Sequence, residues 1–202
     1  DGLLDVPGVF IYGDYRGHRV APGQYKLRLS HRGQVSEQMV TVLPDPRLTN
    51  NATDWQAQQA MLQTLGTQIN DIHKAVAQLR KVRKQVEAYN EVLKDNNTAA
   101  DVLKKGQDLV KKINALESNL IEPRTKNGQD VINWPSKLSV ELFDVRGKVD
   151  AHDPRITQGT RDRLADLSAE WMKHQQSLQA LKQEIQGYNA AFKGLNLPAV
   201  ME

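Results

Sequence analysis

The sequence predicts a mainly α-helical protein: an antiparallel up-down helical bundle of about four helices, two of them long, with a small N-terminal β region. Two patterns support this prediction. Apolar residues recur every three or four positions through most of the chain after residue 48, whereas apolar and polar residues alternate before residue 44. A chain of 202 residues with 39% hydrophobic content can bury a core of ordinary size. We therefore expect a β region over residues 1–47 and a helical bundle over residues 48–202.

The clearest helix is predicted over residues 161–193. Its apolar positions are spaced alternately three and four residues apart, which is typical of one continuous helical face. The nine positions are Leu164, Leu167, Trp171, His174, Leu178, Leu181, Ile185, Tyr188 and Phe192. Gly194 follows as the expected C-terminal cap.

A second long helix is predicted from residue 54 to residue 93 or 94. Thr53 and Gln56 have the spacing of a capping box at its start. The apolar positions are Leu62, Leu65, Ile69, Ile72, Val76, Leu79, Val82, Val86, Tyr89 and Leu93. The step from Leu79 to Val82 is three residues where four is expected, which indicates local overwinding or bending.

Two shorter helices are predicted between the long ones. The first begins near Thr98 and Asp101 and ends before Pro123. A polar loop then covers residues 124–133, and the second short helix begins near Trp134 and Pro135, because proline suits the first helical turn. Their predicted buried stripes comprise Leu103, Val110, Ile113, Leu116 and Leu120, and Leu138, Leu142, Val145 and Val149.

The N-terminal region shows the period of two that is typical of β-strands. Residues 25–30 and 35–43 alternate apolar and polar side chains around a turn at residues 31–33, which predicts a hairpin, and residues 8–12 predict a third strand. Three strands are too few to close a sandwich. The region is therefore either the end of a larger β domain, which we favour, or a small sheet laid against the helices.

The composition excludes several classes of function. The formal net charge of +3 is too small to define a nucleic-acid surface, and no run approaches the roughly 18 apolar residues of a membrane span. The basic cluster of Arg80, Lys81, Arg83 and Lys84 is interpreted as a solvated helix flank. The absence of cysteine excludes disulfides and thiolate sites and suits an oxidising compartment without identifying one.

Few residues suggest a metal site or a catalytic base. Asp150, His152 and Asp153 share one loop and have the chemistry of metal ligands, but they equally suit a turn before a proline. His174 lies in a helical seam, where we expect a buried imidazole that is hydrogen-bonded across the bundle. His73 lacks a His or Glu partner four residues on.

The remaining acidic and aromatic candidates have structural interpretations. Six glutamates lie in helical stretches, where solvated carboxylates are common: Glu87, Glu91, Glu117, Glu141, Glu170 and Glu184. Trp134 and Trp171 are expected to anchor the core, whereas Tyr12, Tyr15 and Trp55 are candidates for an exposed aromatic surface. Asn51 and Asn96 begin glycosylation sequons at predicted helix starts, where capping explains them.

One segment resembles a known family. The segment Arg19–Leu29, followed by Gly33, Val40–Val42 and Asp45–Arg47, resembles the last strands of the immunoglobulin-like module near the C-terminus of large bacterial β-propeller proteins. These proteins carry sortilin-like or BNR-type repeats and are often labelled glycosyl hydrolases. In that family an Asp-Pro-Arg step leads into a helical tail, which often contains steps like Trp134-Pro135 and Leu197-Pro198.

The resemblance implies a secreted or periplasmic protein whose propeller lies upstream of this chain. The sites of any hydrolase activity would lie on that propeller, so no catalytic, cofactor-binding or metal-binding residue is assigned here. We expect a non-catalytic C-terminal module, serving packing, assembly or partner docking. Its partner would be the upstream propeller or another chain, with a homodimer as one case. A glycan- or peptide-binding module that uses exposed aromatics is the alternative, and a glycoside hydrolase accessory domain is a weaker one.

Overall fold

The computed structural model describes residues 2–6, 9, 15–49 and 51–195. A β-hairpin of β1 (Gly23–His31) and β2 (Gln34–Val42) precedes four helices: α1 (Ala52–Leu93), α2 (Ala100–Leu120), α3 (Leu138–Val149) and α4 (Gln158–Lys193). Two short 3₁₀ helices, η1 (Asn97–Ala99) and η2 (Gly128–Ile132), lie before α2 and α3. The predicted mainly α-helical fold with two long helices and a small β region is confirmed.

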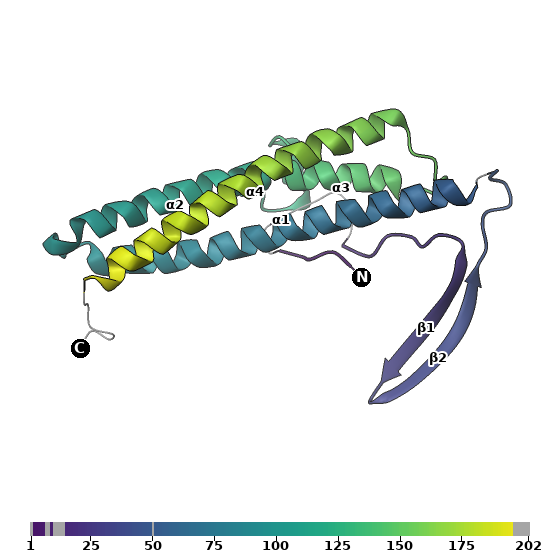
Figure 1. The fold of residues 1–202 in the computed structure, drawn as a ribbon, viewed down its shortest axis with the longest axis horizontal. Helices are drawn as coiled ribbons and strands as arrows, with labels where there is room; N and C mark the ends of the chain where they lie inside the picture. Colours follow the sequence, from purple (N-terminus) through teal and green to yellow (C-terminus); the bar gives the residue numbers. More distant parts are fainter. Residues whose placement is uncertain (1, 7–8, 10–14, 50, 196–202) are drawn as a thin grey trace.

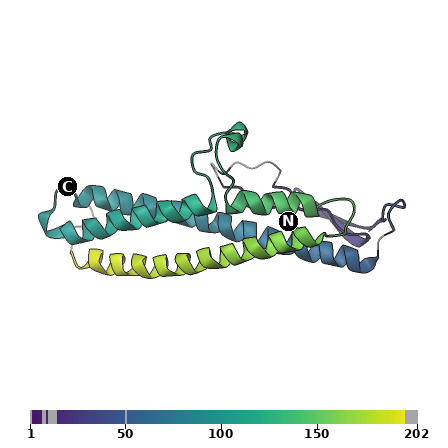
Figure 2. The ribbon, with the colours of Figure 1, turned by 90° about the horizontal axis from the view of Figure 1, so that it is seen from above.

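The helices form an elongated rod (Figure 1). α1 runs the length of the rod, α2 and α3 follow one another in the opposite direction, and α4 returns alongside them. The segment between α2 and α3 therefore does not reverse the chain, as a simple up-down bundle would require. Each of the two short helices occupies one half of the rod beside the two long ones (Figure 2).

The core follows the seams of the two long helices. Eight of the ten predicted α1 seam positions are buried, namely Leu62, Leu65, Ile69, Ile72, Val76, Leu79, Val86 and Leu93. Val82 is half-buried, and the prediction is wrong for Tyr89, which is 44% exposed. All nine predicted α4 seam positions are buried or half-buried. In α2 the buried face is wider than predicted, because the helix contacts both α1 and α4, so that Val102 and Leu109 join the core.

The start of α1 differs from the prediction. Asn51 is the N-cap, its side chain accepts a hydrogen bond from the Asp54 backbone N–H at 2.9 Å, and the Asp54 carboxylate accepts one from the Asn51 backbone N–H. The predicted capping box of Thr53 and Gln56 is therefore wrong by two residues. Asn96 caps η1 through its side chain, which accepts a hydrogen bond from the Thr98 backbone N–H at 3.0 Å, so both sequon asparagines are helix caps.

The start of the third helix was also predicted wrongly. α3 begins at Leu138, with Lys137 in an extended conformation as its N-cap, so Trp134 and Pro135 precede the helix. The predicted polar loop contains η2, capped by Asn127. Gly194 is the C-cap of α4 as predicted, with a right-handed backbone. The predicted strand at residues 8–12 lies outside the described residues except Val9, which is not in a strand, and Leu197-Pro198 lies outside them entirely.

The hairpin is closed by a two-residue turn. Arg32 and Gly33 have φ angles of 47° and 80°, the left-handed pair that matches the twist of two antiparallel strands. Gly23 pairs with Val42 at the base and His31 with Gln34 at the tip. The hairpin extends away from the rod (Figure 1), and its strands pack on each other rather than on the helices.

We predict opposite effects of one substitution at two helical glycines. A Cβ at Gly106, which is buried in α2, would lie 2.0 Å from Asn90 Oδ1 and 3.1 Å from Tyr188 Cε2, whereas a Cβ at Gly187 in α4 meets nothing within 4 Å. Gly187→Ala should raise the free energy of unfolding by about 0.5–1 kcal/mol through helix propensity. Gly106→Ala should lower it by about 1 kcal/mol through overpacking. Urea denaturation measures the free energy of unfolding of both variants. Equal stabilisation by the two substitutions would contradict the close packing of Gly106 against Asn90 and Tyr188.

Candidate functional site

The most unusual surface of the described chain is one face of the hairpin, here called the apolar hairpin face. Residues directly opposite in the register share a face, so Tyr25, Leu27 and Leu29 of β1 lie on one face with Val40 and Val42 of β2. The polar Ser36 and Gln38 lie on the same face, opposite Leu29 and Leu27. Leu27 is 58% exposed and Leu29 is 71% exposed. β1 places an apolar side chain at every second position of this face, and no described part of the chain covers its outer half.

The opposite face of the hairpin is mixed: it carries charged side chains together with Val35 and Met39, which are 51% and 55% exposed. Lys26 and Arg28 lie there within 3.1 Å and 3.8 Å of the Glu37 carboxylate on the neighbouring strand. All three side chains are exposed, so these ion pairs add little stability. A two-stranded sheet with one uncovered apolar face is marginal by itself. We therefore consider the hairpin a candidate for contact with another domain or chain.

The base of the hairpin adjoins the rod at a cleft of about 500 Å³. The half-buried ring of Trp55 in α1 lines this cleft with Pro22, Pro44 and His152. Arg19 links the same region to the α3–α4 loop, because its backbone N–H donates to Asp150 Oδ1 at 3.0 Å and its guanidinium donates to the Asp150 carbonyl. Trp55 thus lies at the junction between the two parts of the molecule.

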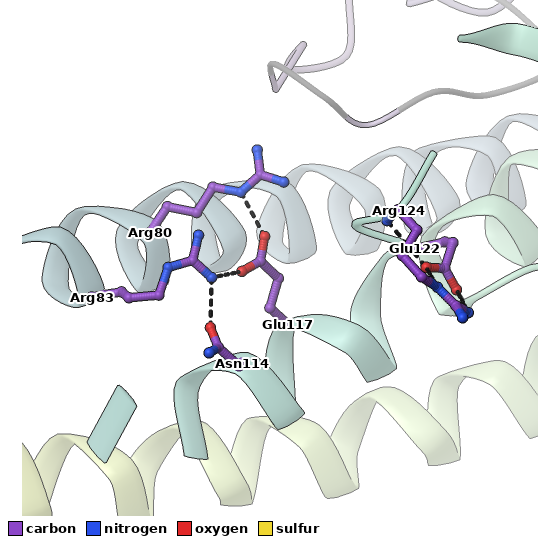
Figure 3. Close-up of polar contacts among 6 residues, drawn as sticks. All are labelled: Arg80, Arg83, Asn114, Glu117, Glu122 and Arg124. Atoms are coloured by element: carbon purple, nitrogen blue, oxygen red, sulfur yellow. Dashed lines mark hydrogen bonds and ion pairs between the residues drawn. The ribbon is translucent and has the colours of Figure 1, made fainter. Parts of the chain in front are cut away.

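Glu117 is the central group of a buried ion cluster between α1 and α2 (Figure 3). Its side chain is 2% exposed and accepts hydrogen bonds from Arg80 Nε and Arg83 Nη1, each at 2.6 Å. Arg83 Nη1 also donates to Asn114 Oδ1 at 2.7 Å. The predicted solvated character of Glu117, Arg80 and Arg83 is therefore wrong, because sequence spacing did not reveal that α2 places a carboxylate opposite these arginines.

A second ion pair orders the segment between α2 and α3. Arg124 contacts the Glu122 carboxylate at 2.6 Å (Figure 3), and this hydrogen bonding lowers the pKa of Glu122. The same guanidinium lies 3.7 Å from the ring centroid of Trp134, a cation–π contact. Trp134 is 36% exposed, so its predicted core-anchoring role is wrong.

His73 joins three parts of the fold. Its Nδ1–H donates to the Leu4 carbonyl at 2.6 Å, so its Nε2 accepts from the Ser139 hydroxyl of α3 at 2.7 Å. The imidazole is fully buried beside the rings of Tyr15 and Phe143. Burial lowers the pKa of His73, against weaker opposing effects from the Leu4 carbonyl and Asp5. We interpret His73 as a structural residue.

The predicted metal-ligand candidates serve the loop itself. Asp153 accepts hydrogen bonds from the Arg155 side chain and backbone, which lower the pKa of Asp153 to about 2, and Asp150 bonds Arg19. Among the described residues, no group of three His, Asp or Glu side chains is arranged to hold a metal ion. His174 is partly buried, and its Nε2 lies 3.7 Å from Oε1 of Glu170 in the same helix. The expected hydrogen bond across the bundle is not found among the described residues.

Of the remaining candidate carboxylates, Glu141 and Glu170 line one cavity of about 370 Å³ together with His174 and Arg163, whereas Glu87, Glu91 and Glu184 do not line it. Glu91 pairs with Lys94, Glu141 with Arg163 and Glu184 with Lys112, while Glu87 is exposed. Trp171 is buried in the α4 seam, so its predicted core role is confirmed. Tyr15 is wrong as an exposed aromatic, because it packs on Phe143, and burial raises the pKa of Tyr15 to about 12. Tyr12 lies outside the described residues.

Comparisons with protein-family models, curated proteins and solved structures found no match to this chain. In the described part of the chain, no helix combines the length and apolarity needed to cross a bilayer. A functional proposal therefore rests on the surface geometry together with the resemblance at residues 19–47.

We predict that Glu117→Gln destabilises the protein by about 2–3 kcal/mol, because it leaves two partly buried guanidinium groups without their anion. Glu91→Gln is the matched control: its pair with Lys94 is exposed and should contribute less than about 0.5 kcal/mol. Chemical denaturation of both variants measures the difference. Similar small losses in the two variants would contradict a structural role for the cluster.

We predict that His73 makes stability depend on pH. The pKa of His73 is below its unfolded value of 6.5, so the unfolded chain takes up the proton first as pH falls. The stabilisation is fully present above about pH 7 and is lost as pH falls below about 6.5, with a slope of up to about 1.4 kcal/mol per pH unit. Unfolding free energies from pH 5 to 8 should show this slope in the parent protein and in His152→Gln, an exposed-site control, but a smaller slope in His73→Gln.

Proposed function

We propose that this chain is a non-catalytic interaction module of an exported β-propeller protein. In this proposal the hairpin forms the last two strands of an immunoglobulin-like domain, and the helical rod is a rigid extension that docks the upstream propeller or another chain. The uncovered apolar hairpin face is the observation that carries the proposal. Apolar side chains that alternate along a strand usually pack against another layer of the same domain or against a partner.

The junction supports the same proposal. Asp45 and Arg47 form a paired turn directly after β2, with Arg47 Nη2 2.6 Å from Asp45 Oδ2. Hydrogen bonds from the Arg47 side chain and backbone lower the pKa of Asp45, and this turn leads through a short connector into α1. A structured turn between the hairpin and the helix would limit how the rod is oriented relative to the β domain.

The alternative is a glycan- or peptide-binding module. It is the weaker proposal, because Tyr15 packs into the helical core and Trp55 is only partly accessible. Its remaining support is the cleft that Trp55 lines with prolines. Saturable quenching of fluorescence by a glycan or peptide, abolished in Trp55→Ala, would favour it over a purely structural role.

We predict that the hairpin amides exchange hydrogen more slowly in a protein that includes the proposed β domain upstream of Asp1 than in the 202-residue chain. In the 202-residue chain the β1 and β2 amides should exchange hydrogen rapidly, and in the longer protein at least 100-fold more slowly. Leu27→Thr and Leu29→Thr should each weaken docking by about 1.5–3 kcal/mol. Val35→Thr is the control, because Val35 lies on the opposite face of the hairpin.

Equally fast exchange in the long and short proteins would contradict this proposal, as would an upstream sequence without a β domain. Light scattering of the 202-residue chain over a concentration series adds a further readout. A dimer that Leu29→Thr dissociates, but Val35→Thr does not, would show that the face can also be covered by a second copy.

A further inference from the structure

Arg146 of α3 is a buried cation without an anionic partner. Its side chain belongs to the core, with only 7% of the residue exposed, and Nη2 donates to the Arg16 carbonyl at 2.7 Å. Its Nε is buried without a hydrogen-bond acceptor, and no carboxylate of the described chain forms an ion pair with it. A guanidinium stays charged in proteins, and burying an unpaired charge is costly.

Other arginines of the described chain show the usual arrangement. Arg80 and Arg83 share Glu117, and Arg163 pairs with Glu141. These three side chains are more exposed than Arg146, yet each has a carboxylate. Among the arginines that the structure describes, the most deeply buried one therefore lacks a carboxylate partner.

Arg146 lines a cavity of about 390 Å³ whose other walls carry neutral or basic groups. Gln59, Gln63, Thr67 and Asn70 follow one another along α1 at spacings of four, four and three residues, so they form one polar strip. His18 of the N-terminal segment lies on the same lining, which includes no Asp or Glu.

Some of these side chains already have partners. Asn70 Oδ1 accepts from the Leu4 N–H at 2.6 Å, and Gln59 Nε2 donates to the Arg19 carbonyl at 3.0 Å. Asn70 thereby presents its amide NH₂ as a remaining donor. The cavity thus combines one buried positive charge with neutral donors.

We propose that this cavity binds a carboxylate group of a small organic acid. A planar guanidinium matches a carboxylate with two parallel hydrogen bonds, and the amide and hydroxyl groups of α1 supply further donors. One guanidinium balances one carboxylate charge, so a monoanion fits the site better than the dianion of inorganic phosphate. This site is distinct from the apolar hairpin face and does not rest on the proposed interaction role.

The test measures binding of acetate, butyrate and inorganic phosphate by calorimetry, in a low-chloride buffer at constant ionic strength. The parent chain should bind at least one of the two carboxylates saturably and more tightly than phosphate. Arg146→Met should weaken that binding at least tenfold. Lys148→Met is the matched control: it removes an exposed cation from the same helix and should change the affinity less than twofold.

A second variant keeps the proposal testable if Arg146→Met does not fold. Gln63→Glu places a carboxylate on the cavity lining from an exposed α1 position. It should raise the melting temperature of the ligand-free protein by a few degrees and weaken carboxylate binding at least tenfold, because the internal anion replaces the ligand. Absence of carboxylate binding in the parent chain, tighter binding of phosphate, or unchanged binding in Gln63→Glu would each overturn the proposal.

Discussion

The fold depends on burial of the continuous apolar seam of α1. Its 42 residues span about 60 Å at the rise of an α-helix, and eight of its seam positions between Leu62 and Leu93 are buried. No single short helix covers that length, so α2 and α3 cover it in succession while α4 packs on both of them. This constraint explains the rod shape and the end-to-end placement of α2 and α3. It also explains why the segment between these two helices does not reverse the chain.

Buried charge is distributed unevenly along the rod. At one level, Glu117 is surrounded by two arginines and an asparagine bonded to one of them, which makes a satisfied cluster between α1 and α2. At another level, Arg146 is buried with a single backbone acceptor and a cavity beside it. The charges around Glu117 are balanced within the chain, whereas Arg146 is a buried cation that an external anion would stabilise.

The hairpin and the rod differ in how they bury apolar surface. The rod buries its seams within one chain, whereas Leu27 and Leu29 remain exposed on a sheet that packs on no described helix. The turn of Asp45 and Arg47 and the ring of Trp55 lie where the two parts meet. This difference underlies the proposal that the rod joins a β domain to another domain or chain.

The sequence by itself determined the type of each main element and the seams, because periods of two and of three to four residues are local properties. It predicted the α4 seam and the hairpin, but it placed the cap of α1 at Thr53 rather than Asn51 and the start of α3 at Trp134 rather than Leu138. Tertiary structure alone decided that Glu117 faces Arg80 and Arg83, that Tyr15 packs against Phe143, and that Arg146 is buried without a carboxylate. Those outcomes depend on which segments of the chain become neighbours. Residue spacing within one segment does not indicate which side chains another segment places opposite it.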